Sequence, residues 1–291
     1  MGTRIDNFAR AAREGTGRGS HATREARLSQ FKDLSRYLDE KNIQVREPKF
    51  LTPKHVAGYV KDLQERGISP GSIQNRLATI RAAWRGAGCE KCDEFASKTN
   101  AELGADPRSR LGTKEAMSED RYSQARADLL SANRTPEAAA LELQRSLGLR
   151  LQEALRSPES LKNWERDLKA GRAVKVALGT KGGRPREVRP ADRERALRAV
   201  QEARKLAGRG HLVRGASGTL KSAYDRLSNS YRAVGLGGRE ASHSVRYAFA
   251  REQFKSYVEQ GHTQAEARAL TSIDLGHGDG RGRYVAMVYL R

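Results

Sequence analysis

The chain has 291 residues and carries 55 Lys and Arg against 35 Asp and Glu, which gives a formal net charge of +20. This length suggests about two domains, and the charge indicates a polyanionic partner, either nucleic acid or an anionic membrane surface. No apolar run approaches the ~20 residues that span a bilayer and the N-terminus lacks a secretion signal, so we expect a soluble nucleic-acid binder that is cytoplasmic, or nuclear in a eukaryote.

The first residues predict a flexible N-terminal arm. Residues 1–20 hold several Arg, Gly and Ala and little apolar content. This composition is typical of a segment that is disordered when free. The arginines of the arm could follow DNA phosphates, although a solvated tail explains them equally well.

A helical unit is predicted over residues 21–88, because apolar residues recur there at helical spacing. Thr52-Pro53 is typical of an N-cap followed by Pro at the first helical position, and Ser69-Pro70 begins another helix in the same way. Gly86 and Gly88 end that last helix. Some arginines on or beside it are candidate DNA contacts, although charged residues on a helix usually form its solvated face: Arg76, Arg81 and Arg85.

Residues 89–112 are polar and interrupted by Gly and Pro, which predicts a linker between two domains. Cys89 and Cys92, the 2 cysteines of the chain, form a lone C-x-x-C at its start. A tetrahedral zinc site needs a second pair of ligands, and the sequence has no further cysteine pair or nearby histidine pair. A redox C-x-x-C normally lies at a strand-to-helix turn of a thioredoxin-like pattern, which is absent here. We therefore expect ordinary reduced thiols near a loop.

A second domain is predicted over residues 113–291. Its two β-type runs, residues 174–178 and 186–190, are joined by Gly-Thr-Lys-Gly-Gly-Arg, which predicts a hairpin with a glycine-rich tip. Arg184 in this tip is a further candidate DNA contact. Helices are expected over residues 118–131, 136–147, 192–207, 220–233, 243–260, 264–273 and 283–290. The predicted fold is therefore mainly α with a small β-hairpin or sheet (α+β), arranged in two domains.

Residues able to act on a phosphodiester are spread along this second domain: Arg150, Lys181, His243, Arg246, His277 and Tyr289. The planar fork of arginine binds phosphate oxygens with paired hydrogen bonds and a charge that it cannot lose. A lysine on a flexible tip can protonate a leaving alkoxide, and a tyrosine can form a covalent phosphotyrosyl intermediate. Such a set suits attack on a phosphodiester without metal.

In order and context these residues resemble the tyrosine recombinases, also called phage-type integrases. Gly-Leu-Arg150-Leu-Gln-Glu153 is similar to the family's first arginine box, His243-Ser-Val-Arg246 to its His-x-x-Arg box, and Leu-Gly-His277 to its Leu-Gly-His box. The resemblance implies that Arg150 and Arg246 clamp the phosphate, with Glu153 as a nearby structural carboxylate. It also implies a helical DNA-clamping domain in front of the catalytic domain.

The same resemblance assigns roles to the remaining residues. Lys181 on the hairpin is similar to the family's β-hairpin lysine, which implies the general acid. His243 would be a proton acceptor or phosphate ligand, and His277 a hydrogen-bond donor to the phosphate. The departure is at the nucleophile, because the family's spacing from His277 would place it at Ala286. The glycine-rich loop after His277 favours Tyr289, with Tyr284 as the alternative.

The resemblance implies a site-specific DNA recombinase or integrase of a prokaryote, phage or mobile element, acting on double-stranded DNA through a 3′-phosphotyrosyl intermediate. It also implies a homotetramer on two synapsed sites and a Holliday junction, without metal, ATP or another cofactor and without a membrane partner. The chain ends shortly after Tyr289, so a tail that docks on a neighbour is either cut off or replaced by other contacts. Two alternatives stay open: a catalytically inactive DNA-binding protein of the same fold, and a type IB topoisomerase.

Overall fold

The computed structural model describes residues 2–17, 19–109, 111 and 115–290, apart from the side chain of Arg239. The chain divides into two compact units, Met1–Ser109 and Arg110–Arg291, which are described separately below. Both are helical, and the second contains a two-stranded antiparallel sheet, which confirms the predicted fold class. Among the described residues, no helix is long and apolar enough to cross a membrane.

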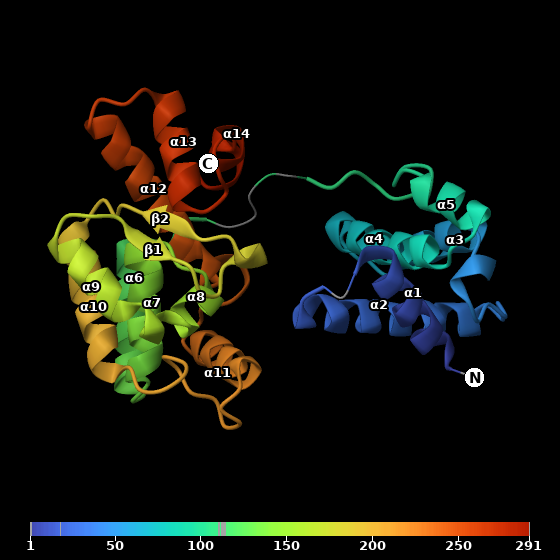
Figure 1. The fold of residues 1–291 in the computed structure, drawn as a ribbon, viewed down its shortest axis with the longest axis horizontal. Helices are drawn as coiled ribbons and strands as arrows, with labels where there is room; N and C mark the ends of the chain where they lie inside the picture. Colours follow the sequence, from blue (N-terminus) through green and yellow to red (C-terminus); the bar gives the residue numbers. More distant parts are fainter. Residues whose placement is uncertain (1, 18, 110, 112–114, 291) are drawn as a thin grey trace. The chain divides into compact units, whose positions relative to one another are not determined.

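The N-terminal unit packs its helices around one apolar core (Figure 1). Its elements are α1 (Arg4–Thr16), α2 (His21–Glu40), the short 3-10 helix η1 (Pro48–Phe50), α3 (Pro53–Glu65), α4 (Pro70–Gly86) and α5 (Glu90–Ser97). Thr52 accepts a hydrogen bond from the backbone N–H of His55, so the predicted N-cap of α3 is confirmed. Trp84 is fully buried, and its indole N–H donates to the carbonyl of Leu51 at 2.9 Å.

The prediction of a flexible arm over residues 1–20 is wrong, because most of this segment forms α1. Thr3 and Asp6 form a reciprocal capping box, which satisfies backbone donors at the start of the helix. Phe8 and Ala12 lie in the core of the unit, and α1 packs against α4. Phe8 and Ala12 follow helical spacing, and Gly86 of α4 allows the close packing, because a Cβ at that position would lie 1.8 Å from a backbone carbonyl oxygen of α1.

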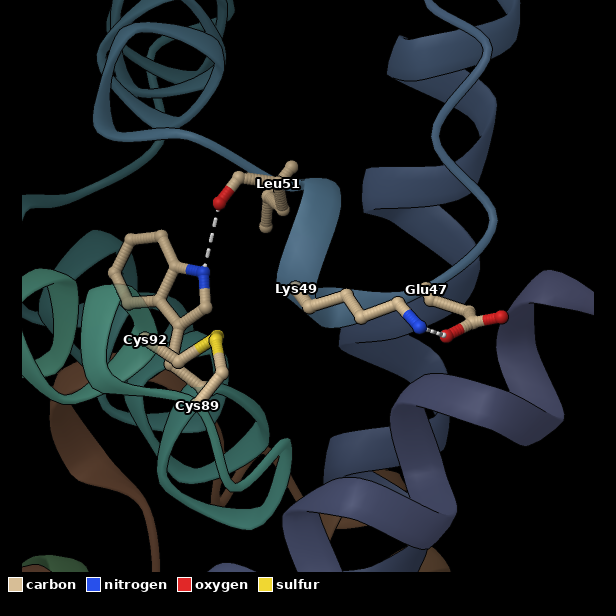
Figure 2. The surroundings of a disulfide bond; sticks show 6 residues. Glu47, Lys49, Leu51, Cys89 and Cys92 are labelled. Atoms are coloured by element: carbon tan, nitrogen blue, oxygen red, sulfur yellow. Dashed lines mark hydrogen bonds and ion pairs between the residues drawn. A yellow bond between two sulfur atoms is a disulfide. The ribbon is translucent and has the colours of Figure 1, made fainter.

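The structure also differs from the prediction over residues 89–112. Most of this segment belongs to the first unit, since α5 packs against α4 and Leu103 is fully buried. Cys89 and Cys92 form a disulfide at the start of α5, so the expectation of reduced thiols is wrong (Figure 2). Cys89 is the N-cap residue and Cys92 lies one turn later, and this helical turn brings their Cα atoms to 5.2 Å.

The C-terminal unit is built around α7, a helix with nearly every side chain buried. The elements of this unit are α6 (Glu119–Ser131), α7 (Thr135–Leu147), α8 (Leu151–Leu155), η2 (Ser157–Glu159), α9 (Leu161–Lys169), β1 (Val174–Val176), η3 (Lys181–Gly183), β2 (Arg186–Val188), α10 (Arg193–Leu206), α11 (Leu220–Ala233), η4 (Gly238–Glu240), α12 (His243–Glu259), α13 (Gln264–Asp274) and α14 (Gly282–Val288). α7 packs against α6, α8, α10, α11 and α12.

The hairpin links two sides of this unit (Figure 1). Val174 pairs with Val188 and Val176 with Arg186, and these inward positions are buried while the intervening residues are exposed. β1 contacts α9, and β2 contacts α13, which itself packs between α12 and α14. The hairpin, the junction of α7 with α8, and the three C-terminal helices therefore meet in one region of the fold.

Candidate active site

The first part of the site is the junction between α7 and α8. α7 ends at Leu147, and Gly148 takes the left-handed conformation, with φ 57°, that turns the chain. Arg150 is then the N-cap residue of α8, and its backbone N–H donates to a carboxylate oxygen of Glu153 at 2.8 Å. Its guanidinium donates to the other oxygen of Glu153, also at 2.8 Å. Arg150 is thereby held in place while its side chain stays 24% exposed.

Arg246 lies in the first turn of α12 and is among the largest fully buried side chains of the molecule. Its two terminal nitrogens donate to the backbone carbonyls of Gly148 and Leu275, which end α7 and α13. A cation at helix C-termini is favourable, because the last carbonyls carry partial negative charge. Each terminal nitrogen has two hydrogens, so one bond to a carbonyl leaves another hydrogen for a further acceptor.

A third arginine, Arg186 of β2, lies beside these two and was missed in the sequence. It is 6% exposed and donates to Glu153 at 2.7 Å and to the carbonyl of Gly148 at 3.1 Å. Its other terminal nitrogen donates to the carbonyl of Asp274 at 2.5 Å. The alternation along β2 could have indicated its burial, because Arg186 lies on the same inward face of the strand as Val188, while Glu187 points outward.

The site carries more positive than negative charge. Glu153 is the carboxylate that faces Arg150 and Arg186, whereas Arg246 is held by carbonyls. Burial alone would raise the pKa of Glu153, but the attraction of Arg186, Arg246 and Arg150 lowers it to about 2. Burial lowers the pKa of Arg246 to about 10, which still leaves it charged at neutral pH. Such a charge distribution is complementary to an anion.

His277 and Tyr289 meet beside this group of arginines. A ring nitrogen of His277, Nε2, lies 3.1 Å from the phenolic oxygen of Tyr289. Burial and the neighbouring Arg246 and Arg150 lower the pKa of His277 to about 3, so its imidazole is neutral at pH 7. One nitrogen of a neutral imidazole accepts a proton, and the contact therefore pairs a phenol with a potential acceptor.

Tyr289 is the tyrosine that the fold places deepest in the site. It is the C-cap residue of α14 and 2% exposed, and its ring lies 4.6 Å from that of Tyr247 and 6.2 Å from that of His243. Tyr284 also touches His277, with ring centroids 5.0 Å apart, but it is 37% exposed. Tyr247 was not anticipated, since an aromatic residue one turn after His243 resembles any core position.

The hairpin tip contains Lys181 and Arg184, and both side chains are exposed. Gly179 at its base lies against the first turn of α8, where a Cβ would come within 2.6 Å of the carbonyl oxygen of Gln152. The tip therefore starts close to Arg150, while the Lys181 side chain itself points into solvent. The described residues include no group of three His, Cys, Asp or Glu side chains that could hold a metal ion.

The candidate DNA contacts on α4 differ in what they contact. Arg81 is used internally: it donates to the carbonyl of Lys98 at 2.7 and 3.0 Å and to the side chain of Asn100 at 2.9 Å. Arg76 is ion-paired with the half-buried Asp33 at 3.4 Å. Arg85 has an exposed side chain. The helix therefore presents these arginines in different environments rather than as one basic stripe.

Two family models match the chain. The model described as Integrase covers residues 104–252, and the model described as Phage integrase, N-terminal covers residues 1–92. The first spans half of the chain and includes Arg150, Lys181 and Arg246. No curated protein matches the chain by sequence.

Several solved structures share the fold. A lambda integrase tetramer bound to a Holliday junction is similar with a TM-score of 0.60 and 18% identity, over 96% of this chain and 75% of that one. The Tn1549 transposon integrase in complex with transposon right end DNA gives a TM-score of 0.58 and 15% identity, over 98% and 94% of the two chains. Lambda integrase residues 75–356 bound to DNA give 0.56 and 18%, over 93% and 97%.

Proposed function

The chain belongs to the phage integrase family, and from this premise we propose that it is a site-specific recombinase that cuts and rejoins double-stranded DNA. The observation that carries the proposal is the convergence of Arg150, Arg246, His277 and Tyr289 on one positively charged site. These residues come from distant parts of the sequence, and a phosphodiester is the anion that this combination of clamp, neutral imidazole and phenol would act on.

The reaction would proceed by transfer of the phosphoryl group to tyrosine. The unused N–H groups of Arg150 and Arg246 bind the non-bridging oxygens of the scissile phosphate. The phenolic oxygen of Tyr289 attacks phosphorus, its proton passes to His243, and the bond to the 5′-oxygen breaks, while the neutral His277 donates a hydrogen bond to the phosphate. Lys181 on the exposed hairpin tip gives a proton to the departing 5′-oxygen. The 5′-hydroxyl of a partner strand then attacks the 3′-phosphotyrosine and releases Tyr289.

His243 lies at the start of α12, next to the ring of Tyr289, and would bind the phosphate or accept a proton. The burial of Tyr289 means that the phenol has to leave the core before it can reach a DNA strand. α14 is seven residues long and contacts α13, so its displacement would disturb few other elements. The same burial is the one observation that favours the second candidate function, a DNA-binding protein that does not cleave.

Residues 113–291 would form the catalytic domain, and the helical unit before it would hold the other side of the DNA. Lambda integrase has been solved as a tetramer on a Holliday junction. We propose the same homotetramer on two synapsed sites for this chain, with net positive charge of the protein favouring DNA over neutral partners.

The test is covalent capture on duplex oligonucleotides that carry a nick beside randomised sequence, because loss of the short cleaved strand traps the protein on DNA. We expect an adduct stable to detergent from the unaltered chain and from Tyr284→Phe, and none from Tyr289→Phe, although Tyr289→Phe still retains DNA. Arg150→Ala or Arg246→Ala should slow adduct formation by about 10²–10³-fold, by analogy with loss of an oxyanion-hole donor.

Each outcome separates the candidates. DNA retention without adduct from the unaltered chain would favour the non-cleaving DNA-binding protein. An adduct that persists in Tyr289→Phe and disappears in Tyr284→Phe would move the nucleophile to Tyr284. Relaxation of supercoiled plasmid without any preferred sequence among the captured oligonucleotides would favour a topoisomerase.

A further inference from the structure

The buried guanidinium of Arg186 has no role in the reaction described above, and its contacts are unlike those of a surface arginine. Its side chain is 3% exposed, and its terminal nitrogens donate to three segments: Glu153 on α8, Gly148 at the end of α7 and Asp274 at the end of α13. Burying a charge in this way costs free energy that a single ion pair seldom returns, so the residue needs another explanation than stability alone.

The three contacted segments are those from which the reacting residues emerge. Arg150 lies between Gly148 and Glu153, and His277 follows Asp274 by a short turn. Arg186 itself belongs to the strand that closes the hairpin of Lys181. The guanidinium of Arg186 is therefore hydrogen-bonded to the segments that carry Arg150 and His277, and its own strand continues from the hairpin tip of Lys181.

The carbonyls that hold the arginines are shared. The Gly148 carbonyl accepts from both Arg186 and Arg246, and the Leu275 carbonyl accepts from both Arg150, at 3.4 Å, and Arg246. A shift of Arg186 would therefore change which acceptors remain for Arg246. A bidentate guanidinium fixes such a geometry better than an ammonium, because its donors have a rigid planar arrangement.

The glycine of the Leu-Gly-His sequence is explained by the same residue. Gly276 has φ +67°, and a Cβ at this position would lie 2.5 Å from Cδ of Arg186. The aliphatic stem of Arg186 therefore passes directly beneath the turn that leads to His277. The turn and the arginine are packed as one unit, in which neither can move without the other.

We propose that Arg186 is a positioning residue of the strand-transfer site, which fixes Arg150, Arg246 and His277 relative to one another by bonding to the backbone and carboxylate that support them. This inference rests on the proposed function, since it concerns the rate of the same cleavage. In this proposal Arg186 does not contact the DNA. It acts by keeping Glu153 ionised and in place, so that Arg150 presents its free N–H groups to the phosphate.

The charge around Glu153 gives the inference a distinctive signature. Arg150 from α8, Arg186 from β2 and Arg246 from α12 face this carboxylate, and His277 stays neutral beside them. The charge of Arg186 attracts the carboxylate of Glu153 more strongly than the charge of Arg246 or of Arg150 does, and so lowers its pKa more. Without Arg186 the carboxylate would take up a proton at higher pH, and Arg150 would then lose its anionic partner.

The experiment compares Arg186→Met and Arg186→Lys in the full chain. Single-turnover adduct formation is measured at saturating protein on a nicked duplex of a sequence recovered by the capture assay, from pH 4.5 to 8. We expect Arg186→Met to cleave about 10²-fold more slowly, which is the cost of a misplacement near 1 Å, and Arg186→Lys to recover part of the rate. DNA affinity should stay within about threefold. Between pH 8 and 4.5 the rate of the unaltered chain should show no loss from Glu153, whose pKa is about 2, whereas the rate of Arg186→Met should fall further toward pH 4.5, because the pKa of Glu153 then rises toward its ordinary value.

The matched control is Arg198→Met on α10, whose side chain is 68% exposed and forms an ion pair with Glu194 at 3.8 Å. It should leave both the rate and its pH profile unchanged. If Arg186→Met does not fold, as urea unfolding would show, Arg186→Lys decides the question by its rate. A folded variant at Arg186 with the rate and pH profile of the unaltered chain would overturn the inference. Absence of adduct from the unaltered chain would instead reject the proposed function itself.

Discussion

Replacing Glu153 with Gln tests whether the centre of the site is held by one ionised carboxylate. The side chain of Glu153 is 0% exposed and bonds to the guanidiniums of Arg150 at 2.8 Å and Arg186 at 2.7 Å. Gln has nearly the same shape but no charge, so the substitution removes the attraction and leaves the packing. Buried arginines would then lack their anionic partner, which is the costly way to break a buried pair.

The magnitude follows from the pKa of Glu153, which falls from 4.5 to about 2 in the folded protein. A fall of this size corresponds to about 3 kcal/mol of stability at pH 7. Because the folded pKa is the lower one, this contribution is complete well above pH 4.5 and disappears as pH falls through about 2. Near pH 3.5 the unfolded carboxyl is already mostly protonated, so about 1.4 kcal/mol of the contribution is lost there.

The assay is urea unfolding of the C-terminal unit, followed by tryptophan fluorescence. The chain has 2 tryptophans, so a Trp84→Phe background leaves Trp164 as the reporter. Trp164 is 2% exposed and its indole N–H donates to the carbonyl of Lys175 at 2.8 Å, which makes it sensitive to unfolding of this unit. Glu159→Gln is the control, because Glu159 lies on the same unit with an exposed side chain, and surface changes usually stay within about 0.5 kcal/mol.

Glu153→Gln should lower the free energy of unfolding by about 3 kcal/mol at pH 7, and the gap to the unaltered chain should narrow by about 1.4 kcal/mol at pH 3.5. The reasoning is refuted if the loss at pH 7 is below about 1 kcal/mol. It is equally refuted if the gap has the same size at both pH values, because the carboxylate would then contribute by shape and not by charge.

Further predictions concern other parts of the chain. Reduction of the Cys89–Cys92 disulfide should destabilise the N-terminal unit by at most about 2 kcal/mol, because the bridge closes a loop with a sequence separation of only 3. With Trp84 as reporter in a Trp164→Phe background, dithiothreitol should lower the urea midpoint of the unaltered chain and not that of a Cys89→Ser/Cys92→Ser variant; equal responses would contradict the disulfide. The ring signals of His277 in NMR should show no titration between pH 7 and 4.5, since its pKa is lowered to about 3, and stability should fall below pH 6.5 because the unfolded imidazole takes up a proton first. A His277 midpoint near 6.5 would show that the ring is not buried against the arginines. Arg81→Ala should cost about 1–3 kcal/mol of stability in the N-terminal unit through its lost bonds to residues 98 and 100. Arg85→Ala should leave stability unchanged and reduce the slope of log affinity for DNA against log salt by about 1. Loss of stability in Arg85→Ala, together with a reduced salt slope in Arg81→Ala, would contradict these two roles.

The sequence predicted what depends on local pattern and on order along the chain. Helix starts such as Thr52-Pro53 depend on a hydrogen bond to a nearby N–H and on the fixed φ of proline, so they can be recognised without the fold. The predicted helix over residues 220–233 and the hairpin at residues 174–190 were found in the same way. The recurrence of Arg150, His243-Ser-Val-Arg246 and Leu-Gly-His277 in one order identified the family before any contact was known.

What the sequence determined by itself was therefore the class of fold and the family, together with a set of candidate phosphate-binding residues. Only the tertiary structure decided how these candidate residues are arranged. The segment of α1 was predicted to be a flexible arm, because its apolar face stabilises a helix only when α4 packs against it. Arg186 was missed in the sequence, because the alternation along β2 marks only its face of the strand, whereas its burial beneath Gly276 depends on segments far away in the chain. The depth of Tyr289 has the same origin, because burial is a property of what packs around a side chain.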